Sequence, residues 1–166
     1  MVSAAIADSA LGRIWDVLDR VMDPEIPVIS VVDLGIVREV RDSGDGFEIV
    51  ITPTYSGCPA TRQIEQDISA ALADAGIAAR LSIVLSPAWT TDWISKAGRE
   101  KLEGFGIAPP VGKAGKRAMF GAEPQVACPQ CGSVETEMIS EFGSTPCKAL
   151  WRCTQCREPF DYFKCL

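Results

Sequence analysis

The feature of this sequence that most constrains its fold is a pair of Cys-x-x-Cys motifs near the C-terminus. The first motif is Cys128 to Cys131, the second is Cys153 to Cys156, and 21 residues separate the two. Four thiols in this pattern are typical of a closed tetrahedral metal site, although the separation slightly exceeds the usual zinc spacing. A segment as short as residues 128–166 cannot bury enough apolar surface to fold alone, so a bound metal would supply the missing stability.

Apolar runs between and after the two motifs predict three short strands, at residues 134–142, 150–152 and 160–164. With the four thiols, these strands predict a zinc-ribbon-like β domain at residues 128–166. Structural zinc is the metal that we expect there. A rubredoxin-like iron or an iron-sulfur cluster stays open as an alternative, because four cysteine thiolates can hold any of the three.

Two further cysteines, Cys147 and Cys165, lie in the tail but outside the motifs. They could be spare ligands, a redox pair or inert cysteines, and inert is the expectation for Cys165. The first residues show no signal peptide, so we expect a protein that is not secreted. In a reducing compartment, its seven cysteines are expected to be metal ligands or reactive thiols rather than disulfides. The sequence therefore predicts a cytoplasmic protein.

Composition limits the class of partner. Hydrophobic residues make up 47% and charged residues 23% of the 166 residues, which is typical of a globular protein. No apolar run approaches the ~20 residues that span a bilayer, so we expect no membrane segment. The net charge is −6. Such a chain has no basic field to displace counterions from phosphates, so we expect no nucleic-acid partner.

The first hundred residues alternate helical and strand patterns. In order, they predict a helix from about Ser9 as N-cap to Met22, strands over 36–41 and 47–52, a helix after Cys58, a strand over 77–85 and a helix that ends near 103. This order predicts a small two-layer α/β (α+β) sandwich of a mixed sheet and helices at residues 1–103. Residues 104–127, rich in Gly and Pro, are expected to be a linker.

Cys58 stands where a strand pattern ends and a helix pattern begins, which makes it the first candidate for chemistry. The pattern places Cys58 at or near the N-cap of the helix and Pro59 at its first helical position. Free amides and the positive end of the helix dipole stabilise a thiolate at such a place. A small buried cysteine under a turn is the competing interpretation, and geometry alone does not separate the two.

The chain contains no histidine. It therefore cannot build a Ser-His-Asp triad, a Cys-His pair, a Glu-x-x-His di-iron site or a two-His-one-carboxylate iron site by itself. Nucleotide-binding glycine loops are also missing from the sequence. These absences favour an accessory component over an enzyme that acts by itself.

Three carboxylates, Asp23, Glu25 and Asp33, lie in turns rather than on a regular helix face, and local evidence favours ordinary turn and cap roles for them. In sequence order, however, Asp23-Pro24-Glu25, Val31-Val32-Asp33-Leu34-Gly35 and Thr52-x-Thr54-x-x-x-Cys58-Pro59 resemble the metal-sulfur cluster assembly domain family. Members of that family help to insert iron or iron-sulfur clusters into client proteins. The resemblance implies that Cys58 is a reactive thiol and that Asp23, Glu25, Asp33, Thr52 and Thr54 line its pocket.

The tail carries a second resemblance. Residues 141–150 and 156–165, joined to an assembly-type domain, resemble the family of small accessory subunits encoded with the multicomponent phenylacetyl-CoA epoxidase of aerobic phenylacetate breakdown. This resemblance implies the oxygenase subunit, the reductase subunit or both as partners, and a role in maturing the iron or iron-sulfur centre of one of them. A non-catalytic scaffold or effector and an iron-bearing electron carrier stay open, as does a homodimer.

Overall fold

The computed structural model describes residues 2–112 and 124–164, with side chains from residue 9 onward. Its compact units are Met1–Trp89 and Thr90–Leu166. The second unit thus takes in residues 90–103, which the sequence analysis grouped with the first domain. The three-part division into 1–103, 104–127 and 128–166 stays a prediction. Cys165 lies outside the described residues.

The first unit is a mixed sheet covered by helices, which confirms the predicted fold class. Its elements are α1 (Val2–Leu18), β1 (Val37–Asp42), β2 (Phe47–Ile51), α2 (Thr61–Asp74) and β3 (Ala79–Ile83). β2 lies in the middle of the sheet, antiparallel to β1 and parallel to β3. α1 begins before Ser9, so Ser9 lies inside the helix and the predicted N-cap is wrong. Its end at Leu18 is earlier than predicted, because the amide of Val21 turns back to the Leu18 carbonyl.

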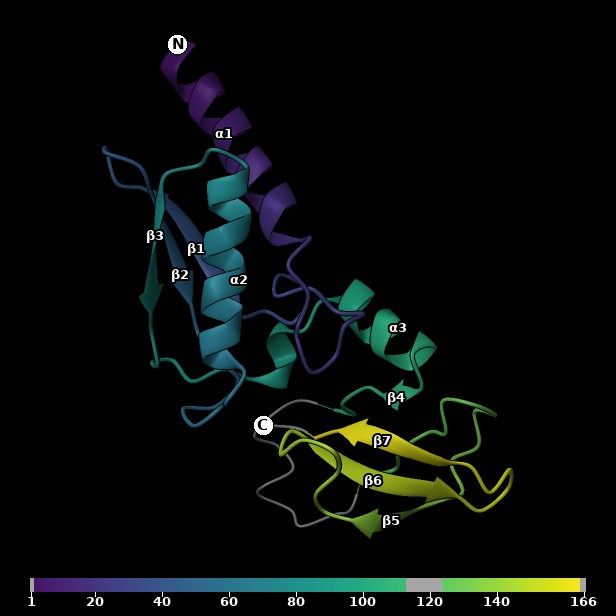
Figure 1. Ribbon diagram of the computed structural model, residues 1–166. Helices are drawn as coiled ribbons and strands as arrows, with labels where there is room; N and C mark the ends of the chain where they lie inside the picture. The colour runs from purple at the N-terminus through teal and green to yellow at the C-terminus, as the bar shows by residue number, and fades with distance from the viewer. Residues whose placement is uncertain (1, 113–123, 165–166) are drawn as a thin grey trace. The chain divides into compact units, whose positions relative to one another are not determined.

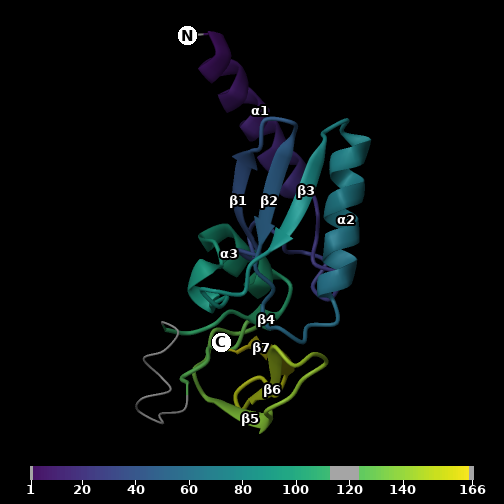
Figure 2. The same cartoon turned by 90° about the vertical axis from the view of Figure 1, so that its left-hand side faces the viewer.

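One face of the first sheet packs against α1 and α2, which lie side by side (Figures 1 and 2). Ile49 of β2, Ile14 of α1 and Ile68 of α2 are fully buried in this layer. The other face carries charge, since Arg41 of β1 and Arg80 of β3 flank Glu48 of β2. This alternation of apolar and charged positions is the pattern expected of a sheet covered on one side.

The turn between β1 and β2 needs a glycine. Gly46 has a φ of +157°, and a Cβ at this position would come within 2.8 Å of the Ala78 carbonyl oxygen. That oxygen accepts a hydrogen bond from the amide of Phe47 at 2.9 Å. The glycine therefore lets the segment before β3 reach the start of β2.

The second unit contains η1 (Thr91–Trp93), α3 (Lys96–Gly104), β4 (Ile107–Ala108), β5 (Thr136–Ser140), β6 (Lys148–Cys153) and β7 (Pro159–Phe163). Its sheet has the order β4-β7-β6-β5, so the three strands predicted for the ribbon are present as an antiparallel set. β4 comes from the range expected to be a linker, and it pairs in parallel with β7. The Arg99 guanidinium ties this segment together by donating to the carbonyls of Thr91 and Pro110.

Aromatic and sulfur-bearing side chains share the core of the second unit. Trp151 and Tyr162 meet edge to face, with ring centroids 5.8 Å apart, and Cys128 and Cys153 are buried in the same cluster. The four-cysteine site is thus built into the core of its sheet. Among the described residues, no helix combines the length and the apolar character needed to cross a membrane.

Candidate functional site

The four motif cysteines come together as the sequence predicted. The Sγ atoms of Cys128, Cys131, Cys153 and Cys156 all lie within 4.8 Å of one another. Cys128 and Cys156 are 3.7 Å apart, and Cys131 and Cys153 are 3.6 Å apart. A tetrahedral zinc with Zn–S bonds of ~2.3 Å would hold its sulfurs ~3.8 Å apart. The cluster therefore fits a single tetrahedral metal ion.

Two similar backbone turns present the sulfurs. In the first, the Cys128 amide donates to the Ser133 carbonyl at 2.8 Å, and in the second the Cys153 amide donates to the Glu158 carbonyl at 3.0 Å. The residue after each motif has a positive φ, 74° at Gly132 and 64° at Arg157. Each motif is thus followed by a residue in the left-handed backbone conformation, and the two turns have the same shape.

Without a cation, these closely spaced thiols cannot all be ionised at the same time, because their negative charges would repel one another. The amide of Cys156 is the largest influence on the Cys153 thiol and lowers its pKa to about 7. The Glu158 amide favours the Cys156 thiolate, but burial and the neighbouring thiols outweigh it and raise the pKa of Cys156 to about 12. Since a like charge nearby disfavours a second thiolate, a divalent cation is what lets all four ionise.

Cys58 lies in a turn before α2, not at its N-cap. Ala60 is the N-cap, and α2 begins at Thr61. The Cys58 amide donates to the Tyr55 carbonyl at 3.1 Å, and the Cys58 carbonyl accepts from the Thr61 amide at 3.2 Å. The chain therefore makes one more turn before the helix, so Cys58 lies near the N-cap, two residues before it, and the predicted placement of Pro59 at the first helical position is wrong. The Cys58 side chain is half-buried.

A cavity of about 220 Å³ lies directly before Cys58 in the chain. Its lining residues are Thr52, Pro53, Thr54, Tyr55, Ser56, Leu85, Ala88 and Trp89. Two of the predicted site residues, Thr52 and Thr54, thus share one cavity. Cys58 is outside the lining but hydrogen-bonded to it through Tyr55. One pocket shared by Cys58, the threonines and the carboxylates stays a prediction.

The predicted carboxylates lie in the loop that follows α1. Asp23 is 6% exposed, and its Oδ1 accepts hydrogen bonds of 2.8 Å from the amides of Glu25 and Ile26. Asp33 is also buried, and its amide donates to Ser30 Oγ at 3.0 Å. Asp23 therefore organises the turn that contains Glu25, which is the structural role that local sequence evidence favoured.

Trp89 connects this loop to the cavity, and sequence reasoning did not single it out. Its Nε1 donates to the Leu34 carbonyl at 3.0 Å while its side chain lines the cavity and is 4% exposed. The bond fixes the Asp33-Leu34-Gly35 turn against the cavity wall. The sequence did offer a signal for this role, since Trp89 follows soon after a predicted strand. A tryptophan that is buried there needs a hydrogen-bond acceptor for its indole N–H.

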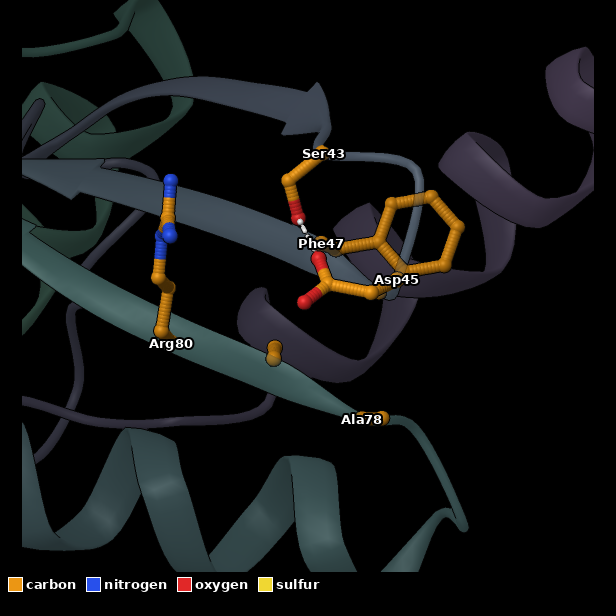
Figure 3. A pocket seen from close by; sticks show the side chains of 7 residues that line it. Ser43, Asp45, Phe47, Ala78 and Arg80 are labelled. Carbon is orange, nitrogen blue, oxygen red and sulfur yellow. Dashed lines mark hydrogen bonds between the residues drawn. The ribbon is translucent and has the colours of Figure 1, made fainter.

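A second pocket in the first unit lies at the β1–β2 turn and the start of β3 (Figure 3). Ser43 donates to Asp45 across it at 3.2 Å, and Arg80 and Phe47 form its walls. Its lining residues carry no thiol. This pocket therefore offers none of the thiol ligands that iron and sulfide chemistry uses.

The fold and the two cysteine sites define a mixed α+β domain joined to a metal-binding ribbon, and comparisons agree with both parts. Residues 12–79 match the family described as iron-sulfur cluster assembly protein, and residues 112–164 match the PaaD zinc beta ribbon domain. A protein of Escherichia coli (strain K12), named as a putative component of 1,2-phenylacetyl-CoA epoxidase, is 50% identical over 164 residues, 98% of each chain. The chain belongs to the family of this protein.

Two further relatives each cover about half of this chain. The "Fe-S protein maturation auxiliary factor YitW" of Bacillus subtilis (strain 168) is 37% identical over 93 residues, which is 54% of this chain and 90% of that one. A crystal structure of a domain of unknown function, DUF59, from Bacillus anthracis has a TM-score of 0.51 at 27% identity and covers 55% of this chain and 89% of its own. Both relatives are covered over about nine tenths of their own length, so they correspond to about half of this chain.

Proposed function

We propose that this protein is an accessory component of a phenylacetyl-CoA epoxidase system and matures the iron or iron-sulfur centre of the oxygenase or its reductase. Cys58 is the reactive thiol. The observation that carries this proposal is a half-buried thiol beside a cavity lined by two threonine hydroxyls and a fixed tryptophan. The names of the Escherichia coli and Bacillus subtilis relatives support the system and the class of role.

The proposed chemistry is ligand exchange. The Cys58 thiol releases a proton to water, and its thiolate replaces one of the ligands of an arriving iron, and that ligand leaves into solvent. The thiolate then leaves as the client's own ligands replace it, so no oxidation is required. Thr52 and Thr54 line the cavity together with Trp89, and their hydroxyl groups would hydrogen-bond to the ligands of that iron. Free thiols of this kind stay reduced in the cytoplasm, where we place the protein.

The four-cysteine cluster has a different role in this proposal, which is to hold structural zinc. Four thiolates and no open position are typical of structural zinc. Zinc and iron can be told apart by metal and acid-labile sulfide analysis, with a visible spectrum, on protein purified without air. We expect one zinc per chain and no visible absorption. Iron with sulfide would instead indicate an electron carrier.

The test of the maturation role compares the iron and sulfide content of the oxygenase and the reductase produced with wild-type or Cys58→Ala protein. We expect at least one client to lose most of its metal with Cys58→Ala. Arg62→Ala, an exposed change on α2, is the matched control and should preserve loading. Equal loading with wild type and Cys58→Ala would refute the role of the thiol and favour a scaffold.

A further inference from the structure

One border of the ribbon sheet exposes more apolar surface than a free edge normally does. β5 is the outer strand in the order β4-β7-β6-β5 (Figure 1). The edge segment, residues 134–142, includes β5 and carries four large apolar side chains with exposed fractions of 46–64%: Val134, Met138, Ile139 and Phe142. Proteins usually protect such edges with lysine, proline or a covering segment, because an open strand pairs readily with another chain.

The charges of the edge segment are all of one sign. Glu135, Glu137 and Glu141 are exposed, and residues 134–142 contain no lysine or arginine. Glu137 already has a partner, since its Oε1 accepts from Arg152 Nε at 3.0 Å. Glu135 and Glu141 remain at the two ends of the exposed apolar pair Met138-Ile139. A chain that covers this segment would therefore gain from apolar residues in its middle and basic residues around them.

This chain's own Lys164 illustrates that match at one end of the segment. Its Nζ lies 4.4 Å from the centroid of the Phe142 ring and donates to the Glu141 carbonyl at 2.9 Å. A cation is thus held jointly by an aromatic face and a backbone acceptor of the edge segment. A basic side chain is thus a compatible neighbour of the edge segment.

A second copy of this chain is a poor occupant. Self-pairing of two edge segments would bring Glu135 and Glu141 of each copy, besides the paired Glu137, to one seam with no basic residue in either segment. Like charges opposite one another in a sheet are destabilising. The charge pattern therefore favours a different chain over a homodimer at this edge.

We infer that the edge segment at residues 134–142 docks an extended, basic and apolar segment of another protein, which adds a strand to the ribbon sheet beside β5. Main-chain hydrogen bonds would provide affinity, and the apolar and acidic side chains would select the partner. Under the proposed function, on which this choice of partner rests, that protein is the oxygenase or the reductase of the epoxidase. The docking surface and the Cys58 thiol are then separate features on the two units.

The test measures binding of full-length protein, loaded with metal, to the purified oxygenase and reductase subunits. Ile139→Lys places a charge in the middle of the edge segment, and we expect at least a tenfold loss of affinity with unchanged metal content and circular dichroism. Ile83→Lys is the matched control, because Ile83 is also an exposed isoleucine at an edge strand, with a fraction of 48%. We expect Ile83→Lys to bind like wild type, and Glu141→Gln to reduce the salt dependence of binding.

The outcomes separate this inference from the proposed function. If Ile139→Lys binds like wild type while Cys58→Ala still lowers iron loading, the docking surface is refuted and the maturation role stands. If wild-type protein binds neither subunit and Cys58→Ala leaves loading unchanged, both are refuted. Sedimentation that shows a wild-type dimer which Ile139→Lys dissociates would assign the edge to a second copy and overturn the inference.

Discussion

The two cysteine sites of this molecule are built in opposite ways. The four-cysteine cluster takes its ligands from two short motifs, each of which shapes its own turn, and two antiparallel strands bring the motifs together. The cavity next to the Cys58 turn is lined by residues far apart in the chain, such as Thr52 and Trp89. A site of the first kind is encoded locally and needs its metal for stability. A site of the second kind is encoded by the fold and should tolerate loss of its thiol.

The largest expected effect is loss of the metal from the ribbon. Cys153 is fully buried beside the aromatic core, so Cys153→Ser removes a ligand and leaves a hydroxyl among apolar groups. Binding of structural zinc contributes roughly 10–16 kcal/mol in small peptides, and we expect this variant to lose its metal and unfold the ribbon. Metal analysis and near-ultraviolet circular dichroism of the aromatic core measure both changes.

Cys147 provides the matched control for that experiment. It is also buried, in the turn directly before β6, but its Sγ lies 3.0 Å from Thr145 Oγ1 and it is not a member of the cluster. Cys147→Ala should therefore keep the full metal content. Loss of metal from Cys147→Ala, or retention of all the metal by Cys153→Ser, would contradict the assignment of the four ligands.

A smaller effect is expected in the first unit, at Asp23. Asp23→Ala would leave the buried amide of Ile26 and the neighbouring amide of Glu25 without their acceptor. Each lost bond to a charged acceptor costs roughly 1.5–3 kcal/mol, so we expect a clear fall in the unfolding midpoint of the first unit. Asp23→Asn keeps an oxygen at the same position and should be much more stable than Asp23→Ala. An equally low midpoint for both variants would mean that the negative charge itself is needed.

Most features that depend on neighbouring residues were predicted from the sequence, and features that depend on residues far apart in the chain were not. The motif spacing was sufficient to predict that the four thiols of Cys128, Cys131, Cys153 and Cys156 come together, and residue periodicity was sufficient to predict β2 and α2 to within a few residues. Residue periodicity was not sufficient to find the first residue of α2 after Cys58, because the extra turn before this helix depends on hydrogen bonds that involve Tyr55 and Thr61. β4 was missed because its two residues become a strand only by pairing with β7. Trp89 acquires its role only through Leu34, 55 residues away along the chain.

The smallest expected effect compares the two motifs of the ribbon directly. Gly132 and Arg157 occupy the same left-handed position after their motifs, at φ values of 74° and 64°. A non-glycine residue there costs roughly 1–2 kcal/mol, part of which is offset because glycine loses more chain entropy on folding. We therefore expect Arg157→Gly to raise the stability of the metal-loaded ribbon by about 0.5–1 kcal/mol and Gly132→Ala to lower it by a similar amount.

Space around Gly132 does not complicate this comparison, since a Cβ there would meet nothing within 4 Å. Chemical denaturation of the metal-loaded protein, followed by tryptophan fluorescence, measures both changes. If Arg157→Gly were instead destabilising, the arginine side chain would have to contribute more than its backbone conformation costs. The two arginines that flank the second motif, Arg152 and Arg157, line the same pocket with Cys153, so that contribution would then be sought beside the thiols. Opposite signs for the two variants would mean that backbone conformation alone distinguishes the two turns.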